Sequence, residues 1–228
     1  MRVDLVKHAA EDADVTSAAR VSTLGGETRF VAASEKDAGL INYLMRDRHG
    51  SPFEHASMTF YIECPIFVSR EFMRHRAGWS YNEESGRYKE LQPVFYAPDQ
   101  HRKLVQVGKP GAYEFEAGTA VQRSALERDL YSAYIWATDH YRSILGRGVA
   151  REIARVVLPV GLYTSFYATC NARSLMHFLS LRTKNSAAKV PSFPQREIEM
   201  VAEQMEEQFK ELMPVTYAAF NANGRVAP

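Results

Sequence analysis

The sequence predicts an α+β fold, a single domain in which a helix-dominated C-terminal half packs on a small, mostly antiparallel sheet. Two patterns lead to this prediction. From His55 to Ile66 apolar and polar residues alternate, as they do in a half-buried strand, with Ala56, Met58 and Phe60 on one face. Helical periodicity dominates the second half of the chain, in four segments: 119–145, 150–158, 171–182 and 195–212.

The other expected elements lie in the first half. A short strand is expected at residues 2–6, and the apolar spacing of Asp37 to Arg48 predicts a helix. Pro65 is suited to open a further helix, from Ile66 to about His75. Residues 77–96 are expected to form a loop with a short strand. Residues 97–118 hold two prolines and three glycines, so we expect them to be irregular and mobile.

Size and composition are those of an ordinary globular protein. A chain of 228 residues is long enough for one or two domains, and no middle stretch has the composition of a linker. We therefore expect one domain over residues 1–228. Apolar residues make up 46% of the chain and charged residues 24%, which argues against a disordered or fibrous protein.

The charge and cysteine content limit the possible partners and compartments. Lys and Arg number 28 against 27 Asp and Glu, so no global field attracts nucleic acid or an anionic membrane. No apolar run approaches the ~18 residues of a membrane span, and the N-terminus lacks a signal-peptide core. Cys64 and Cys170 are the only cysteines, which excludes a disulfide scaffold. These features predict a cytoplasmic protein without a nucleic-acid or membrane partner.

Common cofactor and metal motifs are missing from the sequence. It contains neither G-x-G-x-x-G nor G-x-x-x-x-G-K-[ST], so a flavin or dinucleotide would need a different kind of site. The histidines do not show a zinc-site spacing such as H-E-x-x-H, and no metal is expected.

The densest group of charged residues lies between Arg70 and Arg87. Five basic and three acidic side chains fall within these eighteen residues, so the segment is locally positive. Guanidinium groups make planar, paired hydrogen bonds to phosphate and keep their charge when partly buried. Ser85-Gly86-Arg87 adds a hydroxyl and a glycine that permits close backbone approach. The segment predicts an anion-binding site; a solvated basic helix end is the alternative.

A second polar group lies on the helix expected from Asn171 to Arg182. At about 100° per residue, Ser174 and Arg182 fall on one side of this helix, and Arg173 and His177 on the opposite side. A simple surface helix keeps its polar groups on one stripe. We therefore expect a helix buried on both sides, at a subunit interface, with polar groups directed at a ligand. In the alternative, the polar residues of this helix are buried in the core with their hydrogen bonds made, and one arginine lies at the surface without a ligand.

Arg151 and Arg155 form a third basic pair, four residues apart. Arg155 adjoins apolar residues and is the better ligand candidate, whereas an ion pair with Glu152 or Glu197 is the ordinary alternative.

Five motifs resemble, in order, those of the flavin-dependent thymidylate synthases. The central one is Arg74-His75-Arg76 followed by Ser85-Gly86-Arg87-Tyr88. The resemblance covers about residues 15–200, because four further motifs also match: Ala19 to Ser22, Ser51 to His55, Arg151 to Pro159 and Asn171 to Leu175.

The resemblance implies an enzyme that methylates dUMP to dTMP. It implies methylenetetrahydrofolate as the carbon donor, NADPH as the reductant and FAD as the cofactor that carries the hydride, without an enzyme nucleophile. It also implies a homotetramer whose sites are shared between subunits.

The resemblance also assigns roles to individual residues. Arg182 is expected to activate the pyrimidine, because a guanidinium stabilises negative charge on the ring. The flavin contacts that it implies are Ser51, Arg74, His75, Arg76, Glu83, Asn171, Arg173 and His177. The dUMP contacts that it implies are Glu71, Arg74, Glu83, Glu84, Ser85, Gly86, Arg87, Arg155 and Arg182, with Glu83 to Arg87 reaching dUMP from a neighbouring chain.

The chain departs from the family pattern at three places. Eight residues, not seven, separate Arg76 from Ser85, which leaves the motif acid to be either Glu83 or Glu84. Glu71 stands where many relatives have glutamine, and a carboxylate cannot donate to a pyrimidine oxygen unless it is protonated. Arg196 stands where a tryptophan often follows Pro-Gln.

Two functions of other classes use the same residues. One is a flavin- or nucleotide-binding module without catalysis. The other is an RNA-binding protein in which the Arg70–Arg87 segment holds phosphates and Trp79, Tyr81 and Tyr88 stack on bases.

Overall fold

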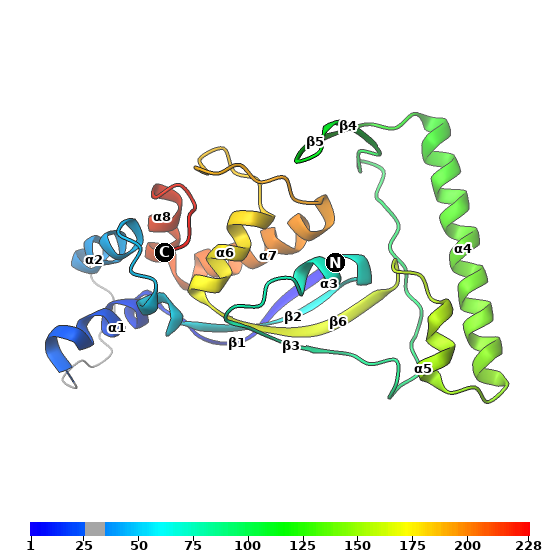
Figure 1. Ribbon diagram of the computed structural model, residues 1–228, viewed down its shortest axis with the longest axis horizontal. Coiled ribbons are helices and arrows are strands. Elements are labelled where there is room, and N and C mark those ends of the chain that lie inside the picture. Colours follow the sequence, from blue (N-terminus) through cyan, green and yellow to red (C-terminus); the bar gives the residue numbers. More distant parts are fainter. Residues whose placement is uncertain (26–34) are drawn as a thin grey trace. The chain divides into compact units, whose positions relative to one another are not determined.

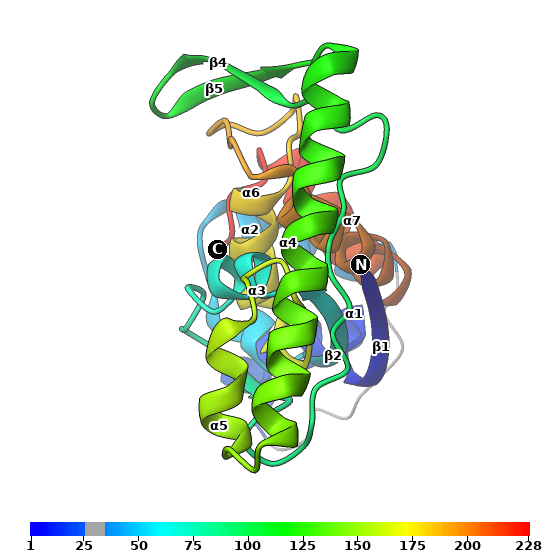
Figure 2. The same cartoon turned by 90° about the vertical axis from the view of Figure 1, so that its right-hand side faces the viewer.

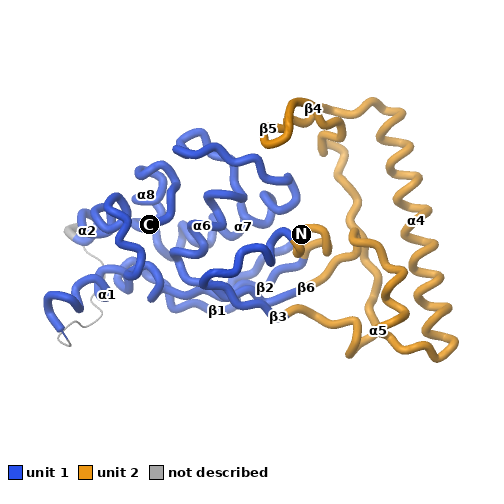
Figure 3. The backbone as a smooth tube through the Cα atoms, in the orientation of Figure 1, with its two compact units in different colours: residues 1–63, 71–82, 166–228 blue, residues 64–70, 83–165 orange. Residues whose placement is uncertain are grey.

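The computed structural model describes residues 1–25 and 35–228. These residues form two compact units (Figure 3). Unit 1 comprises residues 1–63, 71–82 and 166–228, and unit 2 comprises residues 64–70 and 83–165. The α+β prediction is confirmed: strands and eight α-helices occur in the described part, and helices dominate the C-terminal half.

A four-stranded sheet lies mostly in unit 1, in the order β1 (Arg2–Ala9), β2 (Ser57–Pro65), β6 (Tyr163–Asn171), β3 (Trp79–Glu83). Strands β1 and β2 are antiparallel, with Arg2 opposite Glu63. The predicted alternation is confirmed, because Met58, Phe60 and Ile62 are fully buried on one face of β2. Strand β6 was not predicted.

Helices α6 (Ala172–Arg182) and α7 (Arg196–Leu212) lie over one face of the sheet (Figure 1). Their apolar residues recur at helical spacing and are buried; in α7 these are Ile198, Val201, Ala202, Met205 and Phe209. Asn171 caps α6, since its side-chain Oδ1 accepts from the Ser174 N–H at 2.8 Å. The predicted helices at 171–182 and 195–212 are thus confirmed within one residue.

Three further helices complete unit 1: α1 (Asp12–Leu24), α2 (Glu35–Arg46) and α8 (Pro214–Ala222). The helix expected at 37–48 corresponds to α2, shifted by two residues. A short 3₁₀ turn, η2 (Ser51–Glu54), leads into β2.

Unit 2 contains the long helix α4 (Ala120–Gly146), with α5 (Arg151–Ala154) beside it (Figure 2). Thr119 caps α4 by accepting from the Gln122 N–H at 3.2 Å, which confirms the predicted start of this helix. The helix expected at 150–158 is shorter than predicted. Helix α5 ends at Ala154 and the 3₁₀ turn η3 (Arg155–Val157) follows.

The middle of the chain differs from the expectation in two respects. Helix α3 (Ile66–Phe72) ends three residues before His75. Residues 97–118 are not irregular throughout, because strands β4 (Val105–Lys109) and β5 (Ala112–Glu116) form an antiparallel hairpin. Gly111, with φ of +85°, lies in its turn, so the glycine that indicated irregularity serves a regular hairpin.

Candidate active site

The Arg74-His75-Arg76 segment follows the end of α3 in unit 1. The Tyr81 hydroxyl donates to the backbone oxygens of His75 at 2.7 Å and Phe72 at 3.3 Å. Burial raises the pKa of Tyr81, so its hydroxyl keeps the donated proton. The segment therefore has a fixed backbone although it lies outside a helix.

The next residues pack on the first turn of α6. Ser174 Oγ donates to the Ala77 backbone oxygen at 2.9 Å. Gly78 has φ of +70°, and a Cβ placed on it would lie 2.1 Å from Ser174 Oγ and 3.1 Å from Asn171 Nδ2. Only glycine meets both demands. This contact places the residues that follow the 74–76 segment beside Asn171.

Arg182, at the end of α6, contacts two residues of the same region. Its Nε donates to His75 Nε2 at 3.1 Å, and its Nη1 lies 3.2 Å from Glu71 Oε2. Burial, followed by the positive charge of Arg182, lowers the pKa of His75 to about 4. The imidazole is therefore neutral near pH 7 and accepts through Nε2.

Arg173 lies at the other end of α6. Its Nε donates to the Pro228 backbone oxygen at 2.6 Å, and its Nη1 lies 2.5 Å from Glu54 Oε1. A Cβ on Gly50 would lie 2.5 Å from Arg173 Nε, so the residue before Ser51 packs directly on this guanidinium.

His177, one turn along α6 from Arg173, is exposed. Its pKa is lowered by partial burial and then by the charges of Arg173 and Arg48. Ser51, Arg173 and His177 thus share one neighbourhood in unit 1.

Arg74 and Arg76 are exposed, and their side chains make no ion pair or hydrogen bond with residues 1–25 or 35–228. Two unpaired guanidinium groups within one short segment favour an anionic ligand.

The remaining candidate residues belong to unit 2. Glu83 accepts from Thr164 Oγ1 at 2.7 Å, and Glu84 pairs with Lys89 at 2.6 Å. The Ser85 side chain accepts from the Arg87 N–H at 3.2 Å, which forms a tight turn.

Gly86, at the centre of this turn, is buried. A Cβ there would lie 2.9 Å from Leu91 Cδ1 and 3.1 Å from Arg155 Cδ. The S-G-R turn and Arg155 are therefore neighbours. Arg155 is exposed and makes no ion pair with the residues that the structure describes, contrary to the alternative of a pair with Glu152 or Glu197.

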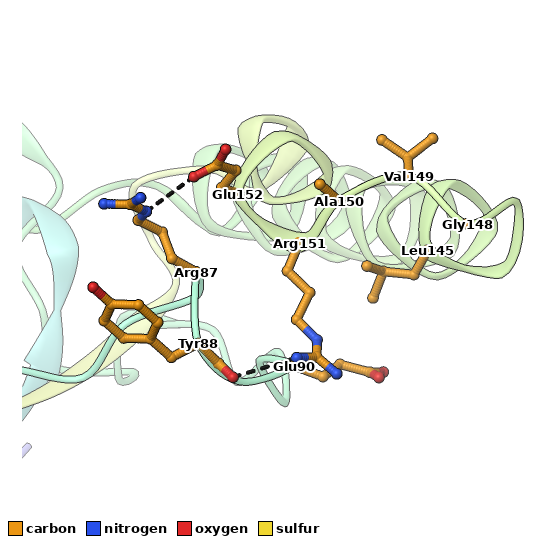
Figure 4. A pocket seen from close by; sticks show the side chains of 9 residues that line it. All are labelled: Arg87, Tyr88, Glu90, Leu145, Gly148, Val149, Ala150, Arg151 and Glu152. Atoms are coloured by element: carbon orange, nitrogen blue, oxygen red, sulfur yellow. Dashed lines mark hydrogen bonds and ion pairs between the residues drawn. The ribbon is translucent and has the colours of Figure 1, made fainter.

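Glu152 pairs with Arg87 instead, at 2.9 Å between Oε2 and Nε (Figure 4). Both side chains are about half exposed, at 55% for Arg87 and 50% for Glu152, so water competes for this pair. They line an open pocket of about 500 Å³. Its other lining residues are Tyr88, Glu90, Leu145, Gly148, Val149, Ala150 and Arg151.

The candidate residues thus form two groups, one in each unit. Unit 1 holds Ser51, Glu71, Arg74, His75, Arg76, Asn171, Arg173, His177 and Arg182, and unit 2 holds Glu83, Glu84, Ser85, Gly86, Arg87 and Arg155.

Sequence reasoning missed the side chains that hold these residues, among them Glu54 and Thr164. They are ordinary polar residues, and only their place in the fold identifies them.

The two thiols and the metal-binding side chains of the described residues are other possible parts of a site. Both cysteines are buried, and burial raises the pKa of Cys64 to about 12, which disfavours a thiolate. Residues 1–25 and 35–228 contain no group of three His, Cys, Asp or Glu side chains able to hold a metal. Among the helices described, none has the length and hydropathy to cross a bilayer.

Known proteins resemble this chain along nearly its whole length. A family model described as "Thymidylate synthase complementing protein" matches residues 4–215. The flavin-dependent thymidylate synthase of Streptomyces avermitilis is 65% identical over 228 residues, which cover 99% of this chain and 93% of that protein. The Tropheryma whipplei protein of the same name is 58% identical over 230 residues, 99% of this chain and 94% of that one.

A solved structure is similar over the whole chain. The UMP/dUMP methylase PolB from Streptomyces cacaoi, crystallised with 5-Br dUMP, has a TM-score of 0.93 at 54% identity. The match covers 100% of this chain and 97% of that one. The chain belongs to the flavin-dependent thymidylate synthase family.

Proposed function

We propose that this protein methylates dUMP to dTMP, with methylenetetrahydrofolate as the carbon donor and NADPH as the reductant. The observation that carries the proposal is the contact of Arg182 with His75, which joins the Arg-His-Arg motif to the end of α6 in a member of this family. Bound FAD supplies the hydride for the reaction.

The residues of unit 1 fit the anionic part of FAD. The unpaired guanidinium groups of Arg74 and Arg76 are suited to its phosphates. Ser51, His75, Asn171, Arg173 and His177 complete this part of the proposed flavin site, and Glu83 is a further contact.

Arg182 is proposed to activate the pyrimidine. A guanidinium beside the ring nitrogen and oxygen stabilises negative charge there without transferring a proton. Its side chain is 20% exposed, so a ligand has access to it.

The S-G-R turn and Arg155 are proposed to hold the dUMP phosphate. The turn supplies a hydroxyl and backbone N–H groups, and Arg87 and Arg155 supply cations. Glu84 is a further nucleotide contact proposed from the resemblance. The resemblance also assigns Glu71 to the nucleotide, but its carboxylate lies 3.2 Å from Arg182 Nη1, and we propose no direct nucleotide contact for it. No enzyme nucleophile is required, in agreement with the raised pKa of both buried cysteines.

We further propose a single domain over residues 1–228 and a homotetramer with shared sites. One family model runs across both units, which supports the single domain. The exposed apolar residues Val121, Tyr131 and Trp136 on α4 support a subunit interface. Free thiols at Cys64 and Cys170 suit the cytoplasm.

The test begins with an absorbance spectrum of the purified protein, which should show bound oxidised flavin. NADPH should bleach the band, and dUMP with methylenetetrahydrofolate should restore it with formation of dTMP. UMP belongs in the same assay as a second acceptor, because the Streptomyces cacaoi structure is of a UMP/dUMP methylase. A protein without flavin that binds RNA with strong salt dependence would contradict the proposal.

Arg182→Ala should lower turnover at least about a hundredfold while FAD stays bound. Arg128→Ala removes an exposed arginine elsewhere and should leave turnover unchanged. Near-normal turnover of the Arg182 variant would refute its role.

A further inference from the structure

We propose that Glu71 is a positioning residue that acts on the reaction through Arg182, and that it does not contact the pyrimidine. This inference rests on the proposed function of Arg182. It concerns a position at which the chain departs from the family pattern, where a carboxylate replaces an amide.

Two contacts fix the guanidinium plane of Arg182. Its Nε donates to His75 Nε2 at 3.1 Å, and its Nη1 lies 3.2 Å from Glu71 Oε2. Both acceptors come from one short segment, four residues apart. Nη2 makes no hydrogen bond to any residue in the described ranges, so its two N–H groups, with the second N–H of Nη1, are left for a ligand.

The chemistry of a carboxylate favours this role. An ionised carboxylate only accepts hydrogen bonds, so it cannot donate to a pyrimidine carbonyl. It can hold a cation, and its bond to a guanidinium is charge-assisted. His75 is neutral, since its pKa lies at about 4, so its Nε2 lone pair accepts from Arg182 without repelling it.

The backbone that carries Arg182 is fixed independently. The adjacent Thr183 is buried; its Oγ1 donates to the Leu179 oxygen at 2.8 Å and accepts from Arg225 Nη2 at 2.7 Å. The freedom that remains lies in the long side chain of Arg182, and Glu71 and His75 restrict it. A flexible arginine has considerable rotamer entropy, and these contacts remove part of it before the substrate arrives.

The kinetic test compares three variants of Glu71 as purified holoenzymes. Glu71→Ala should lower kcat at least tenfold and change KM for dUMP less than twofold. Glu71→Gln keeps an oxygen that accepts from Arg182 and should stay within threefold of the wild type. Glu71→Asp keeps the charge but is one methylene shorter, so it should resemble the alanine variant. Glu207→Ala, which removes an exposed acid paired with Lys210, is the control.

A second measurement is independent of turnover. The imidazole of His75 can be titrated by NMR, with the signal assigned from its loss in His75→Gln. The direct effect of removing the negative charge of Glu71 would be to lower the pKa of His75. Releasing Arg182 from His75 would raise it, because Arg182 is one of the charges that lower it, together with His177. A rise in Glu71→Ala is expected.

Two results would overturn the inference: a raised KM with unchanged kcat, or a pKa of His75 that falls or stays constant. If the wild type forms no dTMP, the proposed function fails. The titration still decides whether Glu71 positions Arg182.

Discussion

The backbone of Gly86 lies against the side chain of Arg155, so close that a Cβ on Gly86 would be 3.1 Å from Arg155 Cδ. The two residues are far apart in sequence, and each belongs to a motif that the family resemblance assigns to the nucleotide. Because of this contact within unit 2, a larger residue at position 86 would press on Leu91 and Arg155.

Gly86→Ala should therefore weaken dUMP binding. The added methyl group meets Leu91 Cδ1 at 2.9 Å and displaces it or Arg155. We expect KM for dUMP to rise about tenfold, equivalent to ~1.4 kcal/mol, measured by steady-state kinetics.

Gly146→Ala is the matched control in the same unit. A Cβ there meets nothing within 4 Å, and the residue lies in α4. Alanine should stabilise the helix by about 0.5–1 kcal/mol and leave KM unchanged. An equal KM for Gly86→Ala and the wild type would contradict the role of the close contact.

A buried ion pair in unit 1 gives a stability prediction. The Arg225 side chain is 1% exposed, and its two terminal nitrogens contact Glu206 at 2.6 and 2.9 Å. Glu206→Gln leaves the Arg225 charge buried without its counter-charge, so the free energy of unfolding should fall by about 3 kcal/mol.

Urea unfolding followed by circular dichroism at fixed protein concentration measures this loss. Glu203→Gln removes an acid that is 49% exposed and paired with Arg196, so it should cost less than about 1 kcal/mol. Similar losses for the two variants would show that burial does not distinguish the two pairs.

Sequence patterns predicted the elements in which apolar residues repeat clearly. Helix α7 is one, because its buried positions are apolar throughout its central turns. Helix α1 was missed because its buried residues include Asp12, Thr16 and Ser17, which carry no apolar periodicity. Strand β6 was missed because its buried face mixes Thr164, Phe166, Ala168 and Cys170, a weaker pattern than that of β2.

For the candidate site, too, the sequence predicted some features and not others. Residue types and motif order identified Arg182, His75 and the S-G-R turn. Their partners could not be predicted, because Glu71 and Arg182 are 111 residues apart and Arg87 and Glu152 are 65 apart. Pairing at such separations is set by tertiary packing, and local sequence carries no signal for it.

Both cysteines should be dispensable for turnover. Cys64 is fully buried and Cys170 is 2% exposed, and burial raises the pKa of each thiol. Cys64→Ala and Cys170→Ala should keep kcat within threefold of the wild type, because a protonated buried thiol is a poor nucleophile. Each substitution should lower the free energy of unfolding by about 1 kcal/mol, because it removes a buried sulfur atom and its packing contacts.

A thiol reagent supplies the check on accessibility. Both thiols should react slowly with the reagent in the folded protein. Both should react rapidly once the protein is unfolded. A hundredfold loss of kcat in either variant, with the fold intact, would restore a cysteine nucleophile to the mechanism.

His75 should make stability depend on pH in a defined range. Its pKa is lowered to about 4 in the folded protein from an ordinary value of 6.5, through burial and then the charges of Arg182 and His177. Below pH 6.5 the unfolded chain binds a proton that the folded protein does not. The free energy of unfolding should therefore fall as the pH drops from about 6.5 to about 4, and His75 should have no effect above pH 7.

His75→Gln isolates this contribution, because glutamine can accept from Arg182 Nε but does not titrate. Urea unfolding of both proteins from pH 4 to 8 gives the difference between their free energies of unfolding at each pH. The contributions of His177 and of the carboxylates are common to both proteins and cancel in this difference. The wild type should lose stability relative to the variant only below about pH 6.5. A difference that is constant across this range would mean that His75 is protonated equally in both states, and its Nε2 would then not be the acceptor that holds Arg182.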